Sequence, residues 1–71
     1  MPHHTTKESA ILSKVRQMRA DKGYSQTFVA LKLGISQNAY SKIESGKSTI
    51  TVGKLVFIAD ILEVDLQELV A

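Results

Sequence analysis

Residues 25–46, which read SQTFVALKLGISQNAYSKIESG, are the stretch that decides the fold. Apolar residues recur at helical spacing on both sides of Gly34, at positions 29, 30 and 33 before it and at positions 40 and 43 after it. Each half therefore predicts a short helix with one buried stripe. Gly34 can adopt the left-handed conformation that ends a helix, and Ser36 is a favourable N-cap for the next one. The stretch predicts two helices joined by a tight turn at Gly34-Ile35-Ser36, which is a helix-turn-helix unit.

The second of these helices carries a polar outward face without a carboxylate. The residues on that face are Gln37, Asn38, Ser41, Lys42 and Ser45. A helix that enters the major groove of DNA must avoid negative charge and offer short groups that hydrogen-bond base edges. Gln and Asn can pair with adenine, and Lys can donate to guanine. We therefore predict base contacts from Gln37, Asn38, Ser41 and Lys42; the alternative is an ordinary solvated helix face.

The same stretch resembles the XRE-type family of Cro and lambda-repressor-like DNA-binding domains. The matching elements are Ser25-Gln26, Val29-Ala30, Gly34-Ile35-Ser36 and Ile43-Glu44-Ser45-Gly46-Lys47. The resemblance covers nearly the whole chain beyond about residue 9, and many matched positions at fixed spacing make it specific. It implies an all-α, five-helix, lambda-repressor-like domain with the helix-turn-helix at helices 2 and 3. Such a domain is similar to the small single-domain regulators of phages, plasmids and restriction-modification systems.

The resemblance also implies roles for residues around the helix-turn-helix. Gln26, at the first turn of helix 2, would hold a DNA phosphate, as a helix N-terminus already favours an anion. Ser45 and Lys47 are expected to contact phosphates as well. Arg19 matches the arginine that pairs with the glutamate at position 44, so we expect a structural ion pair between Arg19 and Glu44; two unpaired surface charges are the alternative.

Helix 4, expected from Val52 to Leu62, is apolar over most of its circumference, which implies burial on more than one side. Phe57 stands where the family usually has a polar residue, and Phe28 and Leu31 depart from the family in the same way; the sequence does not decide whether the latter two are buried. A twofold interface is therefore predicted, formed by Ile50, Val56, Phe57, Val64 and Val70.

The resulting hypothesis is a regulator that binds double-stranded DNA as a homodimer on a roughly palindromic operator. An antitoxin-like or other protein-binding module that uses the apolar surface of helix 4 is the alternative.

Length and composition agree with one small domain. The chain has 71 residues, of which 44% are hydrophobic and 23% charged, and it has no Cys. Residues 1–54 hold nine Lys and Arg and three Asp and Glu, so their formal charge is nine minus three, or +6, whereas residues 55–71 hold four acidic and no basic residues. Such a segregation suggests a polyanionic partner on the basic side, with chance placement as the alternative.

Because no apolar run is long enough for a leader or a membrane span, a cytoplasmic protein is expected.

The remaining elements follow from capping signals. Residues 1–8 are expected to form an N-terminal arm and the start of helix 1, with Thr5 as its cap, and residues 9–71 the DNA-binding domain. Ser25 and Thr51 are expected to cap helices 2 and 4, and Asp65 and Glu68 to form a capping box. No nucleophilic Cys, Gly-rich phosphate loop or HExxH motif is present, and His3-His4 lacks further ligands. We therefore expect no enzyme activity, no metal and no cofactor.

Overall fold

A computed structural model describes residues 6–70 of the chain. Over this range it contains five helices and no strand: α1 Thr6–Asp21, α2 Gln26–Leu33, α3 Gln37–Ser45, α4 Val52–Leu62 and α5 Leu66–Val70. The all-α, five-helix prediction is therefore confirmed. The first five residues of the expected N-terminal arm, which include the Thr5 cap and the His3-His4 pair, lie outside the described residues.

Side-chain caps begin three of the helices at the positions that the sequence predicts. The hydroxyl of Ser25 accepts a hydrogen bond from the Phe28 amide at 3.0 Å, and that of Ser36 accepts one from the Ala39 amide at 3.0 Å. Thr51 caps α4 in the same way, with 3.1 Å between its hydroxyl and the Lys54 amide. Each cap satisfies a backbone N–H that lacks a partner inside its own helix.

Of the predicted capping box at the start of α5, the contact made by the Glu68 carboxylate is present. The Asp65 amide donates to the Glu68 carboxylate at 2.9 Å, and the Glu68 amide donates to the backbone carbonyl of Asp65 at 2.9 Å. The carboxylate therefore reaches back to the start of the helix as a capping box requires. This contact fixes where the short last helix begins.

The turn between α2 and α3 depends on the left-handed conformation of Gly34. This residue has φ 74° and ψ 27°, and its amide donates back to the carbonyls of Ala30 and Leu31. Residues with a side chain rarely adopt that conformation because it is strained, so glycine is favoured at this position. Ile35 then turns inward and packs against the core, which sets the angle between the two helices.

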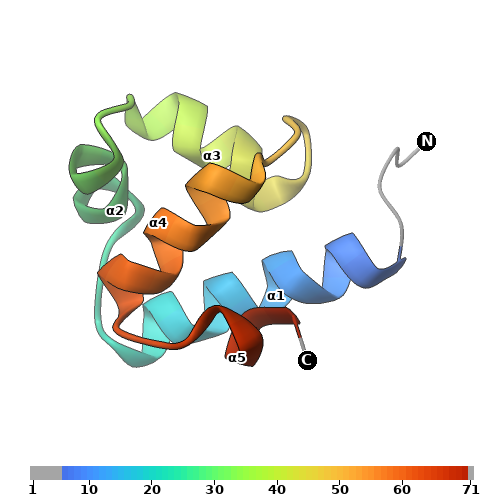
Figure 1. The fold of residues 1–71 in the computed structure, drawn as a ribbon. Coiled ribbons are helices and arrows are strands. Elements are labelled where there is room, and N and C mark those ends of the chain that lie inside the picture. The colour runs from blue at the N-terminus through green and yellow to red at the C-terminus, as the bar shows by residue number, and fades with distance from the viewer. Residues whose placement is uncertain (1–5, 71) are drawn as a thin grey trace.

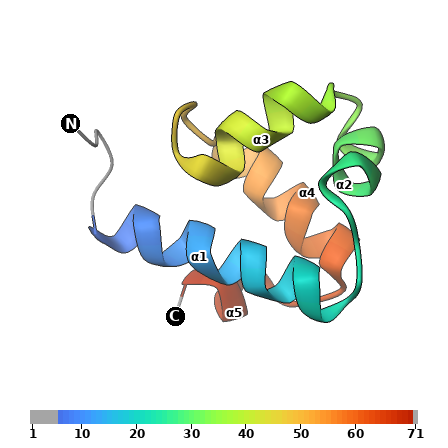
Figure 2. The ribbon, with the colours of Figure 1, turned by 180° about the vertical axis from the view of Figure 1, so that it is seen from behind.

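One apolar core holds the five helices together. Figures 1 and 2 show α4 crossing the domain between α1 and the start of α3, with α2 at one end, α5 against α1 and the C-terminal end of α3 approaching α1. The core residues come from all five helices: Val15, Val29, Ala30, Tyr40, Leu55, Ile58, Ala59, Leu62 and Leu69. This packing leaves one side of α3 free at the edge of the domain.

No helix among residues 6–70 is long and apolar enough to cross a membrane.

Candidate nucleic-acid interface

The free side of α3 presents the polar residues that the sequence singled out. Gln37, Asn38 and Lys42 are exposed, and Ser41 is half-buried. The opposite side of the helix is buried and holds Tyr40, Ile43 and Glu44. Glu44 is the only carboxylate of α3, and because it points into the domain, the exposed face carries no negative charge. The four predicted base-contacting residues therefore lie on one helix at the edge of the fold (Figure 1).

Gln26 joins the start of α2 to the start of α3. Its side-chain amide donates to the Glu44 carboxylate at 3.0 Å, and its amide oxygen accepts from the side chain of Gln37 at 3.3 Å. These contacts orient both glutamine side chains. The predicted phosphate-contacting residue and the first predicted base-contacting residue are thus brought together in space.

A buried network around Glu44 supports this arrangement. The Arg19 guanidinium meets the two oxygens of the Glu44 carboxylate at 2.8 and 3.1 Å, and the Tyr40 hydroxyl donates to one of them at 2.6 Å. The Glu44 side chain is only 2% exposed and that of Arg19 is 18% exposed. A buried carboxylate costs stability unless it is paired and hydrogen-bonded, and here it receives four hydrogen bonds in all, one of them from Gln26. The ion pair expected from the sequence is therefore present and fixes α1 against α3.

The pKa of the Glu44 carboxyl reflects this network. Burial alone would raise it, but the hydrogen bonds from Arg19, Tyr40 and Gln26 and the positive charge of Arg19 outweigh burial, so the pKa lies below its usual value. For the Tyr40 hydroxyl, burial is the main cause of a raised pKa, and the hydrogen bond to Glu44 adds to it. Glu44 therefore carries its charge at neutral pH, and Tyr40 donates its proton to that charge.

Two further contacts of this region were not predicted. The sequence placed the Tyr40 side chain only on the apolar face, yet its hydroxyl belongs to the Glu44 network. The four-residue spacing from Tyr40 to Glu44 was a usable signal, because residues at that spacing are neighbours on a helix. Arg16 donates to the backbone carbonyl of Glu44 at 2.9 Å. A cation at this position compensates the partial negative charge at the C-terminal end of α3. No local sequence motif predicts this contact.

The predicted phosphate contacts after Glu44 lie in and beyond the last turn of α3. The Ser45 hydroxyl donates to the backbone carbonyl of Lys42 at 3.1 Å, so its oxygen can still accept a further hydrogen bond but its proton is engaged. Gly46 ends the helix in the left-handed conformation with φ 85°. Lys47 follows directly and is exposed. The amine of Lys47 therefore projects from the loop that leads to α4.

The apolar residues assigned to a twofold interface differ in exposure. Phe57 is 50% exposed, and Val56 and Val70 are also exposed. Ile50 and Val64 are half-buried and pack against the domain's own core. The second apolar side of α4 is therefore open in the single chain. Phe28 is 36% exposed and Leu31 is 74% exposed. Neither side chain is therefore buried, which the sequence alone did not decide.

Comparisons with known proteins agree with this geometry. The sequence profile of a family described as helix-turn-helix matches residues 15–69. A search of curated proteins gave no match. Among solved structures, the chain is similar to SinR, the master regulator for biofilm formation, in a crystal structure in complex with DNA; the TM-score is 0.74 and the identity 29%, over 86% of this chain and 98% of the SinR chain. The family match runs from the second half of α1 into α5 and includes the candidate interface, and the chain belongs to the XRE-type helix-turn-helix family.

Proposed function

We propose that this protein is a transcription regulator that binds double-stranded DNA in a sequence-specific way, with α3 in the major groove. The observation that carries the proposal is the exposed face of α3, which has no carboxylate and whose first residue, Gln37, is held by Gln26 at the N-terminus of α2. Membership of the helix-turn-helix family supports it, and so does the likeness to SinR, whose structure is in complex with DNA.

The contacts divide into two groups by what they can read. Base edges would be contacted from α3, by Gln37, Asn38, Ser41 and Lys42. Phosphates would be held by Gln26 and Lys47, which lie before and after α3, and by Ser45 in its last turn once the hydroxyl proton turns from the Lys42 carbonyl to the phosphate. Phosphate contacts position the domain without reading sequence, whereas base contacts specify the site. Such a regulator would act in the cytoplasm.

Homodimerisation is part of the proposal. A symmetric dimer with its two recognition helices about 34 Å apart would read a roughly palindromic operator, one half-site for each copy. The proposed interface comprises the exposed Phe57, Val56 and Val70 and the half-buried Ile50 and Val64. Exposed aromatic and aliphatic side chains of this kind favour a protein contact.

A protein-binding module is the second candidate function. The exposure of Leu31 and Phe57 favours it, because large apolar side chains on a small monomer often mark a contact with another protein. In that case α3 would be a solvated polar helix, and the protein would not select a DNA sequence.

Selection of bound sequences from a random pool of DNA duplexes tests the function directly. A DNA-binding regulator is expected to enrich a motif with two inverted half-sites whose centres lie about 10 base pairs, one turn of DNA, apart. Enrichment of a single half-site would retain the proposed DNA binding and contradict the dimer. Failure to enrich any sequence at low salt would favour the protein-binding module.

Gln37→Ala and Lys47→Ala are expected to differ in a way that separates base contacts from phosphate contacts. Loss of the Gln37 amide should cost about 1 to 3 kcal/mol on the selected site and relax the preference at one base position. Loss of the Lys47 amine should weaken binding to all sequences alike. Fluorescence anisotropy with the selected site and its single-base variants measures both. Gln67→Ala, at an exposed position on α5, is the matched control; equal behaviour of Gln37→Ala and Lys47→Ala across all sites would contradict the assigned roles.

Phe57→Asp is expected to weaken dimerisation and, through it, operator binding. The substitution places a charge inside the proposed contact, where burial without a partner is unfavourable. Sedimentation velocity at tens of micromolar, together with operator affinity, measures the effect. Ala10→Asp, which adds the same charge on the exposed face of α1, is the control. An unchanged dimer in Phe57→Asp would exclude Phe57 from the interface.

A further inference from the structure

A chain of hydrogen bonds runs from the buried carboxylate of Glu44 to the exposed face of α3. Oε1 of Glu44 accepts from the Gln26 side-chain amide at 3.0 Å, and Oε1 of Gln26 in turn accepts from the side-chain amide of Gln37 at 3.3 Å. Glu44 is 2% exposed, Gln26 is half-buried and Gln37 is exposed. The chain therefore connects the interior of the domain to the first residue of the helix that carries the proposed base contacts.

The direction of each hydrogen bond in this chain follows from the charge of Glu44. A glutamine side chain has one oxygen that accepts and one NH₂ group that donates, and the two are so similar in shape that the planar amide fits its neighbours in either orientation. An ionised carboxylate has no such choice, because both of its oxygens only accept. Gln26 must therefore turn its NH₂ group to Glu44 and its oxygen to Gln37. Gln37 must in turn direct its NH₂ group to Gln26.

The other partners of Glu44 also require an acceptor on both sides of the group. Oε2 of Glu44 accepts from the Arg19 guanidinium at 2.8 Å and from the Tyr40 hydroxyl at 2.6 Å. Arg19 donates to Oε1 as well, at 3.1 Å. Because arginine has donors and no acceptor, an amide at this position would set a donor against the guanidinium. The network thus favours a carboxylate over an amide of the same size.

We propose that Glu44 determines which base Gln37 reads, by fixing the order of donor and acceptor on the Gln37 side chain. The inference rests on the proposed function, in which α3 enters the major groove. With its NH₂ group on the side of Gln26, Gln37 offers a base edge one N–H and, beside it, one carbonyl oxygen. Adenine presents the complementary pair, N7 as acceptor beside the N6 amino group as donor, whereas guanine presents two acceptors, N7 and O6. Glu44 is therefore a positioning residue for adenine recognition that acts through Gln26.

Replacement of the carboxylate by an amide reverses the chain. In Glu44→Gln, Arg19 and Tyr40 both still donate toward the former Oε2 position, which favours the new amide oxygen there. The new NH₂ group then faces Gln26, which has to present its oxygen to it and its own NH₂ group to Gln37. Because phosphate contacts hold the domain in one register on the duplex, the reversed Gln37 would set its oxygen against N7 and its NH₂ group against the amino group of adenine.

Base preference, measured apart from overall affinity, tests the inference. The position to examine is the one at which Gln37→Ala loses its preference, and fluorescence anisotropy with four duplexes that differ only at this base pair gives the ratios for each protein. The wild type is expected to prefer adenine there at least about tenfold, and Glu44→Gln less than about threefold. A loss of stability alone would weaken binding to all four duplexes in the same proportion.

The double variant Gln26→Glu with Glu44→Gln supplies a rescue. The new carboxylate at position 26 only accepts, so it takes the NH₂ group at position 44 on one side and that of Gln37 on the other. Gln37 thereby regains its wild-type orientation. The added negative charge near the duplex is expected to weaken binding to all four sequences, while the adenine preference returns to within about threefold of the wild-type ratio.

Gln26→Leu interrupts the chain without removing the pair between Arg19 and Glu44. It therefore keeps the test independent of whether Glu44→Gln remains folded, which circular dichroism checks for every variant. Without a partner that fixes its direction, Gln37 can present either order to the base, so the adenine preference is expected to fall below about threefold. An adenine preference equal to that of the wild type in Gln26→Leu would overturn the inference.

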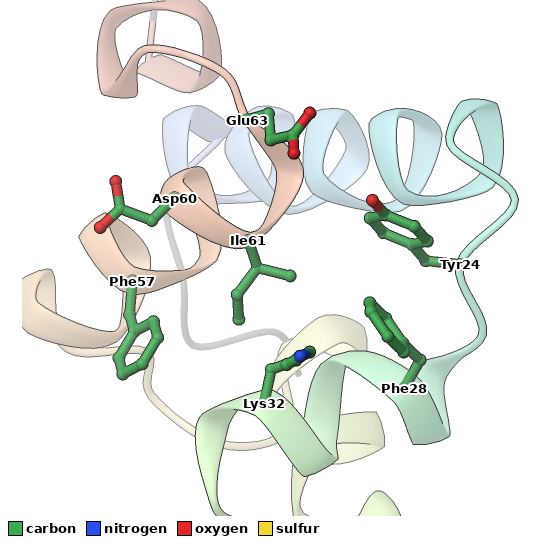
Figure 3. A pocket seen from close by; sticks show the side chains of 7 residues that line it. All are labelled: Tyr24, Phe28, Lys32, Phe57, Asp60, Ile61 and Glu63. Carbon is green, nitrogen blue, oxygen red and sulfur yellow. The ribbon is translucent and has the colours of Figure 1, made fainter.

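Two controls separate orientation from stability. Tyr40→Phe removes one hydrogen bond to Glu44 and leaves the carboxylate, so it is expected to lower the Tm and to keep the adenine preference. Glu63→Gln makes the same chemical change at a carboxylate that is 73% exposed and lines a groove between α2 and α4 (Figure 3). It is expected to match the wild type in both affinity and base preference.

The outcomes distinguish this inference from the function on which it rests. An undiminished adenine preference in a folded Glu44→Gln, a double variant without recovery, or a wild type that prefers another base at this position would each overturn the inference and leave the proposed function in place. A wild type that selects no duplex would contradict the proposed function and the inference together.

Discussion

Raising the concentration of monovalent salt from 50 to 200 mM is expected to weaken operator binding on the order of 1,000-fold or more. The physical reason is counterion release: each phosphate that a Lys or Arg side chain neutralises frees condensed ions from the duplex, and added salt opposes that release. All nine Lys and Arg of each copy lie within residues 1–54, the part of the chain that holds the helix-turn-helix, and a dimer would use them for roughly 6 to 10 phosphate contacts. Such a number gives a steep dependence of affinity on salt.

The measurement is a titration of the selected duplex at several salt concentrations, followed by fluorescence anisotropy. Lys47→Ala is expected to reduce the slope of log affinity against log salt by about one for each copy bound, because it removes one phosphate contact. Lys22→Ala is the control: it removes a cation that pairs with Glu63 at the surface and should leave the slope unchanged. A flat response of the wild type would contradict binding through the phosphate backbone.

Most of the local structure could be predicted because its signals are short-range. Gly34, Ser25 and Ser36 each act on backbone groups within four residues, so their presence in the sequence is nearly sufficient to place the ends of α2 and α3. The same holds for Thr51 and for the pair Asp65 and Glu68. Arg19 and Glu44 were paired across 25 residues only because the family resemblance supplied the partner.

Features that depend on tertiary packing could not be predicted. Whether Phe28 and Leu31 are covered depends on how closely α4 approaches α2. The spacing of apolar residues within α2 carries no information about that distance. Arg16 reaches the end of α3 only because α1 crosses it. The end of α4 is a further case: Glu63 adopts φ 60° at its C-cap, a conformation that usually favours glycine, so the residue type gave no signal there.

Disruption of the pair between Arg19 and Glu44 is expected to have the largest effect on stability. Arg19→Ala leaves a carboxylate that is only 2% exposed without its cationic partner, and such a change costs about 3 to 5 kcal/mol of unfolding free energy. In a domain of this size that corresponds to a fall in Tm of at least about 10 °C. Lys22→Ala breaks the exposed pair with Glu63 and serves as the control, with an expected cost below about 1 kcal/mol. Thermal unfolding followed by circular dichroism distinguishes the two variants.

The same pair predicts how stability depends on pH. The pKa of the Glu44 carboxyl is lower in the folded protein than its ordinary value of 4.5, so the unfolded chain takes up a proton at this site before the folded one does. The contribution of Glu44 is therefore fully present above pH 4.5 and is lost as pH falls below that value toward the folded-state pKa. Urea unfolding at a series of pH values should show this loss in the wild type and a shallower one in Glu44→Gln, which has no proton to bind. Equal slopes below pH 4.5 in the two proteins would show that Glu44 does not control acid stability.

An unchanged Tm in Arg19→Ala with abolished DNA binding would assign the arginine to the DNA contact instead of the scaffold.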